Sequence, residues 1–392
     1  MALPVTPAAI DTPAVSAPAR GTRFEPRAAR SPVSIDRSAC LRLRTHLAEC
    51  RACAAVCPTQ AIAAGSQTLE LGAGCTGCGR CQSACPNAAL AVVGFEIDAA
   101  VVPQTSAAVT VECQRAPAGS GALRVPCLGG LSPACLLTLC AGAAQSRVVL
   151  VDRGWCGACE SGGVSHPAQA TLERVNAWLA EAGVPAPLRP AIAAPARDMA
   201  TPRAGADPMQ QQGRARRGFF AALARPSSEV PRSGGAAIRS APSSQRQQTI
   251  AALELLAERH VGRMPADLFH RLDVAAACRG HRVCASACPT GALVRWRDDG
   301  ASRMGLAFDN ASCIGCGHCA AVCPEQAMQL HRGAGDAGRG RRPLTIFEQR
   351  ECPDCGSRFA ASDGEDESRC QRCRTSARLV RSAFQTLFGA RP

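Results

Sequence analysis

The sequence predicts an α+β fold class, in which two small cysteine-rich domains flank a small α/β domain and a four-cysteine module follows them. Three observations lead to this prediction. The chain of 392 residues is long enough for two or three domains. Its 25 cysteines fall in short-spaced groups rather than in scattered pairs. The segment between the two largest groups alternates strand-like and helix-like apolar runs.

Cysteine usage and charge limit the classes of protein that fit. The N-terminal segment has no sustained apolar core, and a run of about 18 apolar residues is absent from the sequence. Grouped cysteines without an export signal indicate metal ligation in a reducing compartment, so we expect a cytoplasmic protein without a membrane span. The net charge is +13, but a site of four metal-bound thiolates carries about −2 and several would offset it. Aromatic residues make up only 3% of the chain, which disfavours a nucleic-acid partner.

Residues 1–35 are rich in Ala and Pro, which predicts a disordered arm. Residues 36–98 form the first cysteine block. Its second half is C-x2-C-x2-C-x3-C-P, and its first half widens the first gap to nine residues. Such spacing lets one loop wrap an iron–sulfur cube with three thiolates, while the Cys that precedes Pro binds the neighbouring cluster. The two predicted [4Fe–4S] ligand sets are Cys40, Cys50, Cys53 and Cys85, and Cys75, Cys78, Cys81 and Cys57.

This block resembles the bacterial dicluster ferredoxins, although its wide first gap departs from their simplest members. The alternative is a pair of zinc knuckles. Zinc ribbons use two C-x2-C pairs, not two four-cysteine runs that each end in Cys-Pro, so iron–sulfur clusters are favoured.

Residues 105–190 predict a small α/β domain with a parallel sheet. Strands are expected at 108–113, 122–127 and 146–152, and helices at 132–144 and 166–183. Four cysteines follow strand ends, where the loops of a parallel sheet converge: Cys113, Cys127, Cys156 and Cys159.

The order of these strands, cysteines and helices is similar to the delta-subunit family of hydrogenases coupled to heterodisulfide reductase. That resemblance implies a [2Fe–2S] cluster on the four cysteines, and the alternative is that they are buried thiols. Cys135 and Cys140 lie among leucines on a predicted helix and are expected to be structural.

Residues 191–248 have the composition of a disordered linker, and an Arg-Arg-Gly-Phe-Phe string lies within it.

Residues 249–335 then repeat the ferredoxin-like theme, which indicates an internal duplication. One ligand set is complete and consists of Cys288, Cys313, Cys316 and Cys319. The other contains Cys278, Cys284 and Cys323, with His281 at the register of the missing thiolate. It is predicted to hold a His-ligated [4Fe–4S] cluster, a [3Fe–4S] cluster or none. The remaining histidines, His46, His166, His260, His270, His318 and His331, are expected to be exposed, packing or flanking residues.

Residues 347–378 contain two C-x2-C pairs separated by fourteen residues, formed by Cys352, Cys355, Cys370 and Cys373. This spacing predicts a zinc ribbon, with rubredoxin-type iron as the alternative. The predicted architecture is thus two bacterial ferredoxin-like dicluster domains, an α/β domain between them, a C-terminal zinc ribbon, and a disordered arm and linker.

The favoured function is a multi-cluster electron carrier or relay that passes single electrons between soluble redox-partner proteins. No G-x-G-x-x-G motif follows a strand and no acid–base pair stands out, so independent catalysis is not expected. The alternative is a cytoplasmic accessory or maturation protein for a formate dehydrogenase or nitrate reductase type of enzyme. That alternative rests on the resemblance of the Arg-Arg-Gly-Phe-Phe string to the accessory ferredoxins of periplasmic nitrate reductase, and its docking elements would be the ribbon and the Arg-rich segments.

Overall fold

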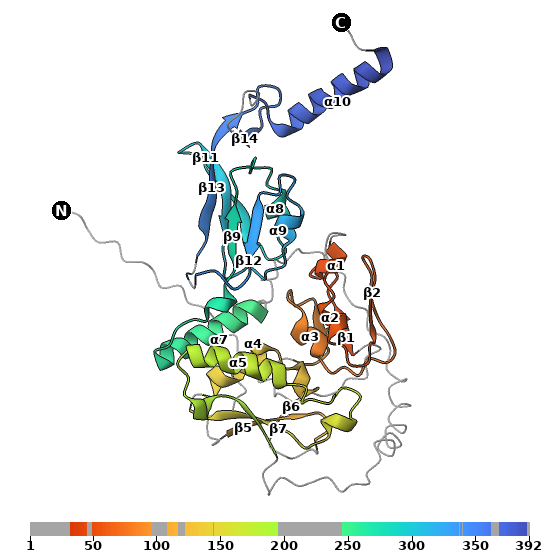
Figure 1. Cartoon of the computed structure of the whole chain (residues 1–392), viewed down its shortest axis with the longest axis vertical. Helices are drawn as coiled ribbons and strands as arrows, with labels where there is room; N and C mark the ends of the chain where they lie inside the picture. Colours follow the sequence, from red (N-terminus) through yellow and green to blue (C-terminus); the bar gives the residue numbers. More distant parts are fainter. Residues whose placement is uncertain are drawn as a thin grey trace, which may run out of the picture.

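The chain is described by a computed structural model, in which the α/β unit lies at one end and the C-terminal helix projects from the other (Figure 1). Most of the predicted arm, His46 and the Arg-Arg-Gly-Phe-Phe string lie outside the described residues. The described residues are 32–44, 49–95, 97, 108–116, 122–143, 145–194, 245–336, 338, 340–361 and 368–389.

The first cysteine block consists of two short antiparallel strand pairs around three short helices. Its elements are β1 (Val33–Ile35), α1 (Leu41–Arg44), α2 (Ala52–Ala55), β2 (Ile62–Ala64), β3 (Leu69–Leu71), α3 (Arg80–Ala84) and β4 (Leu90–Val92). β1 pairs with β4, and β2 pairs with β3. The prediction that residues 33–35 belong to a disordered arm was therefore wrong. Val33 is buried against the block, which gives this end of the segment a place in its core.

The middle unit is a four-stranded parallel sheet in the order β6-β5-β7-β8. Its elements are β5 (Ala108–Cys113), β6 (Leu123–Val125), η2 (Leu128–Gly130), α4 (Pro133–Gly142), β7 (Arg147–Val151), η3 (Cys156–Ala158), α5 (Gln169–Glu181), η4 (Ala186–Leu188) and β8 (Ala191–Ala193). The sheet is parallel, as predicted, but it has one strand more than the sequence indicated. The extra strand, β8, comes from the start of the predicted linker and pairs with the edge of β7.

Helix α7 (Gln245–His260) packs against α4 and α5 of the middle unit (Figure 1). Its buried side chains Ile250, Leu253 and Leu256 belong to the same apolar core as Val111 and Leu150 of the sheet. The predicted boundary at residue 249 assigned this helix to the second cysteine block. Its apolar face instead completes the core of the α/β unit, because that core would otherwise expose one side of α4.

The second cysteine block and the terminal module are joined by one sheet. Their elements are η6 (Ala266–Leu268), β9 (Arg271–Val274), α8 (Val283–Ala287), β10 (Leu293–Asp298), β11 (Arg303–Phe308), α9 (His318–Ala321), β12 (Met328–His331), β13 (Arg342–Glu351), β14 (Arg358–Ala360) and α10 (Gln371–Phe388). β9 pairs with β12, and the second sheet has the order β10-β11-β13-β14. β13 pairs with β11 near its start and with β14 at its end.

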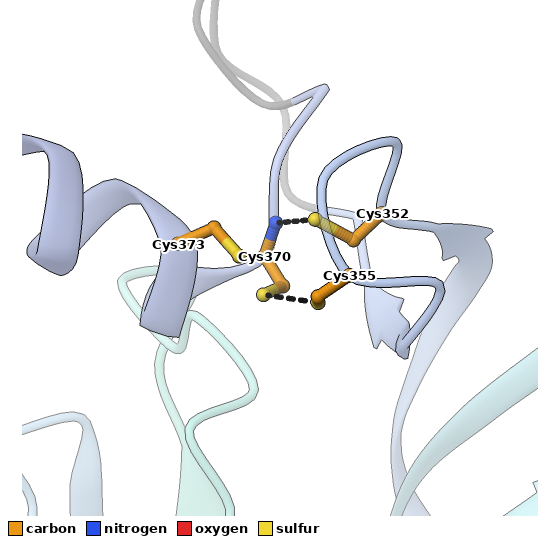
Figure 2. Close-up of side chains that lie close together, drawn as sticks. All are labelled: Cys352, Cys355, Cys370 and Cys373. Carbon is orange, nitrogen blue, oxygen red and sulfur yellow. Dashed lines mark hydrogen bonds between the residues drawn. The ribbon is translucent and has the colours of Figure 1, made fainter.

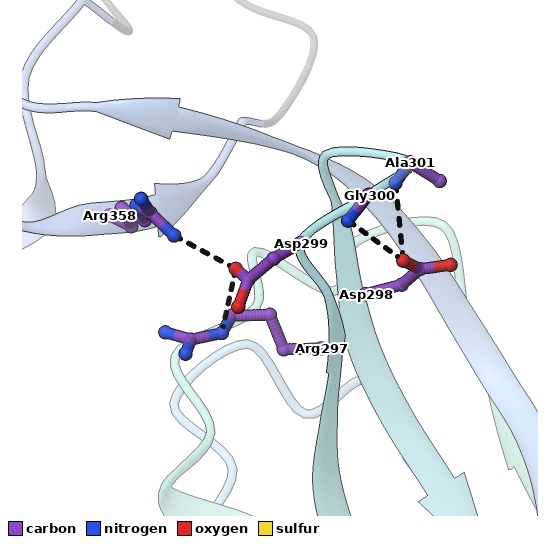
Figure 3. A network of polar contacts seen from close by, with 6 residues as sticks. All are labelled: Arg297, Asp298, Asp299, Gly300, Ala301 and Arg358. Atoms are coloured by element: carbon purple, nitrogen blue, oxygen red, sulfur yellow. Dashed lines mark hydrogen bonds and ion pairs between the residues drawn. The ribbon is translucent and has the colours of Figure 1, made fainter.

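The terminal module and the second block therefore share β13, which belongs to both parts. A surface network adds to this connection. The Asp299 carboxylate accepts from Arg297 at 3.1 Å and from Arg358 at 2.8 Å, which links the β10–β11 turn to β14 (Figure 3). All three side chains are about half exposed, so each ion pair contributes less than about 1 kcal/mol.

Candidate metal centres

The structure gathers the eight predicted ligands of the first block into two neighbouring groups, which we call site I and site II. Site I contains Cys57, Cys75, Cys78 and Cys81, and site II contains Cys40, Cys50, Cys53 and Cys85. Burial raises the pKa of Cys53, and the nearby Cys50, Cys85 and Cys40 thiols raise it further. Burial likewise raises the pKa of Cys81 to about 12, with contributions from Cys78 and Cys75 and a smaller one from Cys53 of site II. Thiols held this way cost free energy to ionise unless a cation binds them.

The second block repeats this arrangement in site III and site IV. Site III contains Cys288, Cys313, Cys316 and Cys319, and site IV contains Cys278, Cys284, Cys323 and His281. Burial raises the pKa of Cys319 to about 12, with further increases from Cys313, Cys316 and Cys288. Three of the cysteines that precede a proline accept a backbone N–H from the segment that follows them. These contacts are Ala89 to Cys85 at 3.2 Å, Leu293 to Cys288 at 3.4 Å and Ala327 to Cys323 at 3.4 Å.

The loop of site IV keeps the backbone conformation of the complete runs. In sites I and III, the second cysteine lies between two left-handed glycines, Gly77 and Gly79 or Gly315 and Gly317. In site IV, His281 lies between Gly280 at φ 66° and Arg282 at φ 65°. A left-handed conformation is unfavourable for Arg, so the surrounding structure maintains it at some cost. His281 therefore occupies the backbone position that a cysteine ligand has in the other two loops.

The side chain of His281 has a carboxylate partner. Its Nε2 lies 3.0 Å from Oε1 of Glu325, and the His281 side chain is 19% exposed. Burial raises the pKa of Cys278, and both Cys323 and Glu325 act in the same direction. Glu325 therefore lies near the Cys278 thiol as well as beside the imidazole.

Four of the six cysteines of the middle unit line one cavity, which we call the thiol pocket. Its empty volume is about 780 Å³, part of it open to solvent, and Cys113, Cys127, Cys156 and Cys159 all contribute to its wall. Burial raises the pKa of Cys127 to about 11, and the Cys78 and Cys113 thiols act in the same direction. The pKa of Cys156 is raised by burial, by Asp152, and by Cys113 and Cys159. Cys135 and Cys140 lie on α4 outside this lining, and burial raises the pKa of Cys140 to about 12.

The thiol pocket also has polar walls that sequence reasoning missed. Glu112 is 1% exposed, and its Oε1 accepts from Arg153 at 2.6 and 3.0 Å. Its second carboxylate oxygen is buried without a hydrogen-bond partner. The sequence could have indicated this ion pair, because Glu112 lies inside the apolar run of β5 and a buried carboxylate needs a cationic partner.

A second group of unlike ligands lies beside the pocket. The carboxylate of Asp152, the thiol of Cys156 and a ring nitrogen of His166 all lie within 4.8 Å of one another. His166 was expected to be an exposed or packing residue, but it is half-buried next to a candidate ligand. Its Nδ1 accepts the backbone N–H of Ala168 at 3.3 Å, which places the proton of a neutral ring on Nε2. A neutral ring in this tautomer is not ready to bind a metal through Nε2.

The thiol pocket and site I share an interface. Arg80 donates to the carbonyl oxygens of Ser161 and Gly162 at 2.6 and 2.9 Å, and Thr76 and Ser161 share a hydroxyl hydrogen bond of 2.7 Å. A Cβ at Gly130 would lie 2.3 Å from the carbonyl oxygen of Cys78, so only glycine allows this approach. The wall of the pocket is therefore packed directly on the loop of site I.

The terminal module brings its four cysteines together (Figure 2). Their ligand atoms all lie within 4.8 Å of one another, and the Cys355 and Cys370 sulfurs are 3.6 Å apart. The backbone N–H of Cys370 donates to the Cys352 sulfur at 3.3 Å. It is the largest of several hydrogen bonds that together lower the pKa of that thiol to about 6. Zinc–sulfur bonds of about 2.3 Å in a tetrahedron separate sulfurs by about 3.8 Å, so the spacing fits one metal ion.

Comparison with known protein families supports iron–sulfur binding in both blocks. Residues 277–327 match the family model of a 4Fe-4S dicluster domain, and residues 48–95 match that of an LdpA Fe-S cluster-binding domain. No curated protein matches the chain. Within the described residues, none of the helices combines the length and apolar character needed to cross a membrane. The chain thus contains two iron–sulfur binding regions, and the second includes His281.

Proposed function

We propose that the protein is an electron relay in which iron–sulfur centres follow one another from the thiol pocket to site IV. The observation that carries this proposal is that one thiol of a group lies close enough to the next group for the charge of that group to raise its pKa. Cys78 of site I raises the pKa of Cys127 in the thiol pocket. In the same way, Cys53 of site II raises the pKa of Cys81 in site I. Electron transfer slows steeply with distance, so centres this close can exchange electrons.

The contact between the two blocks extends this series. Burial lowers the pKa of His318, which precedes Cys319 of site III, and Arg44 of α1 lowers it further. The start of α7 contacts both blocks. Gln245 donates to the carbonyl oxygen of Gln82 at 2.9 Å, and Arg246 donates to that of Ala311 at 2.7 Å. The proposed order is therefore thiol pocket, site I, site II, site III and site IV.

The residues present fit the proposed cofactors. Sites I to III each offer four thiols for a [4Fe–4S] cluster, with amide N–H groups directed at several sulfurs. The thiol pocket offers four thiols from three loops, which suits a [2Fe–2S] cluster. The terminal module offers a closed set of four thiols, which suits structural zinc. When bound, the clusters accept and donate single electrons; the chain's contribution is to hold them in series and to limit their exposure to water.

For site IV, we propose that His281 replaces the missing thiolate through Nδ1. Two observations support this. The left-handed loop places His281 at the register of the ligand, and Glu325 accepts from Nε2, which leaves Nδ1 without that proton. A metal-binding histidine generally donates its other ring N–H to a carboxylate or carbonyl group. Replacing a thiolate with neutral imidazole removes one negative charge, so site IV would have a higher reduction potential than sites I to III.

The relay is tested by stepwise reduction of the anaerobic protein with EPR at each potential. Spin–spin interaction between neighbouring reduced centres is expected, and Cys78→Ser should remove the interaction between the thiol-pocket cluster and site I. If each centre gives an isolated spectrum, the series is wrong. The maturation alternative predicts instead a salt-sensitive complex with an apo-enzyme that forms whether or not the clusters are reduced.

A further inference from the structure

The C-terminal helix α10 presents an apolar face that is not covered by any described part of the chain. No residue of its eighteen is buried. Five large apolar side chains are between 48% and 74% exposed, namely Leu379, Val380, Phe384, Leu387 and Phe388. The rings of Phe384 and Phe388 pack on each other with centroids 4.9 Å apart. In Figure 1 the helix projects from the end of the molecule opposite the α/β unit.

These side chains form one continuous face. Val380, Phe384, Leu387 and Phe388 follow the i, i+3, i+4 spacing of a single helix stripe, and Leu379 extends the stripe to one side. At about 100° per residue, the apolar arc covers roughly half of the circumference of the helix. Such an arc is wider than the seam of a coiled coil, which uses only two of every seven positions.

The opposite face of α10 is basic. Arg374, Arg378 and Arg381 follow one another at helical spacing, and no acidic residue occurs between 368 and 392. Two copies of this helix packed together would bring like charges along both flanks of the seam with no acidic partners, which disfavours self-association. Positive charge on one face and Phe and Leu on the other instead match a helix that lies in the interface of an anionic bilayer.

We propose that α10 binds an anionic phospholipid surface, lying parallel to it with Phe384, Leu387 and Phe388 inserted among the lipids. Arg378 and Arg381 would remain at the level of the phosphate groups, where each arginine adds to the affinity. The helix begins one residue after Cys370, so the terminal four-cysteine site fixes its base. Docking would therefore hold the end of the molecule that carries site IV and the terminal module near the lipid.

The proposal is tested by sedimentation of the full-length, metal-replete protein with lipid vesicles in the absence of any electron donor. The wild-type protein is expected to bind vesicles of phosphatidylglycerol and phosphatidylcholine in equal parts, and to bind pure phosphatidylcholine vesicles at least about tenfold more weakly. High salt should reduce the binding to the anionic vesicles, because it screens the arginines.

Two pairs of substitutions separate the apolar and basic contributions. Phe384→Asp with Leu387→Asp should weaken binding to anionic vesicles at least about tenfold, because two large side chains lose their burial in lipid. Arg378→Gln with Arg381→Gln should also weaken it about tenfold or more and reduce the effect of salt. The matched control, Val164→Asp with Leu255→Asp, changes exposed apolar residues elsewhere and should bind as the wild type does. Iron and zinc contents should be the same in all four proteins, which shows that the fold is retained.

Three results would overturn the proposal. The first is equal binding to neutral and anionic vesicles. The second is unchanged binding in both α10 variants. The third is a dimer of the lipid-free protein that Phe384→Asp with Leu387→Asp converts to a monomer, since the apolar face would then belong to a second copy. None of these results depends on cluster potentials, so the relay would remain to be judged by its own experiment.

Discussion

Nε2 of His281 and Oε1 of Glu325 are 3.0 Å apart, across a separation of 44 residues in the chain. Glu325 follows the Cys323–Pro324 pair, so the segment that brings Cys323 to site IV also brings the carboxylate partner of His281. A carboxylate at Nε2 favours the tautomer with its proton there and leaves Nδ1 as a lone-pair donor. This pair is the basis of the first prediction.

Replacing His281 should change the iron nuclearity of site IV. His281→Ala is expected to lose one iron and to give the EPR signal of an oxidised [3Fe–4S] cluster, which the wild-type protein should lack. His281→Cys should restore four irons and lower the potential of the site, because a thiolate adds negative charge. Glu325→Gln is expected to retain the cluster with a shifted potential. A three-iron signal in the wild-type protein, or identical spectra in all variants, would contradict ligation by His281.

Loss of a thiol-pocket ligand should remove one small cluster and leave the others intact. Cys127→Ser is expected to lose about two of the roughly 18 irons of four [4Fe–4S] and one [2Fe–2S] cluster. The measurement is iron content together with EPR of the reduced protein. Cys135→Ala is the control, because Cys135 lies on α4 outside the pocket lining. If Cys127→Ser retains the same iron content as this control, the four cysteines are buried thiols without a cluster.

The packing of α7 on the α/β unit can be measured by a cavity mutation. Leu253→Ala removes a fully buried side chain and should lower the free energy of unfolding by about 2–5 kcal/mol in anaerobic urea denaturation. Leu255→Ala, two residues away and 46% exposed, should change it by no more than about 0.5 kcal/mol. Equal effects of the two substitutions would mean that α7 does not dock through this face.

Metal loss from the terminal module should loosen only part of the second sheet. In Cys373→Ser, hydrogen exchange is expected to quicken in β14 and at the end of β13, where the two strands pair near Cys352. The start of β13 should stay protected, because its partner there is β11. If β13 and β14 are as well protected from hydrogen exchange in Cys373→Ser as in the wild-type protein, the module does not need its metal. Loss of protection in β11 as well would show that the two parts unfold together.

Zinc itself is expected at about one ion per chain, with iron as the competing metal. Element analysis of protein purified from a medium containing both metals distinguishes them. Cys373→Ser should lose the zinc and retain all of the iron, since the four sites of the two blocks use other cysteines. Loss of one iron atom in place of zinc would favour the rubredoxin-type alternative.

The grouping of the cysteines could be predicted from the sequence because their spacing is local. Three of the four cysteines of sites I and III come from a single short loop, so the spacing of these cysteines is enough to group them. The same holds for the two C-x2-C pairs of the terminal module. The position of the fourth cysteine, which comes from the other half of the block, could also be expected, because the Cys-Pro ending marks it.

Long-range packing could not be predicted in the same way. The pattern of Ile250, Leu253 and Leu256 shows that α7 has a buried face, but a pattern does not say which surface covers that face. Short strands such as β1 and β8 have three residues each, too few to show a period. Glu112 and Arg153 are 41 residues apart, and only the fold places them in contact. Glu325 was missed for the same reason.

The position of α7 bears on how the two halves of the chain could separate. The chain leaves the α/β unit at β8, ending at Ala193, and returns to the same apolar core at Gln245. A protease that cut between these two residues would sever the polypeptide without removing α7 from α4 and α5. The two fragments would be expected to co-elute and to reassemble when expressed from separate genes. Removal of the second block at residue 249, by contrast, would uncover the α4 surface in the first product and Leu253 and Leu256 in the second, so truncation there should yield aggregation rather than a smaller ferredoxin.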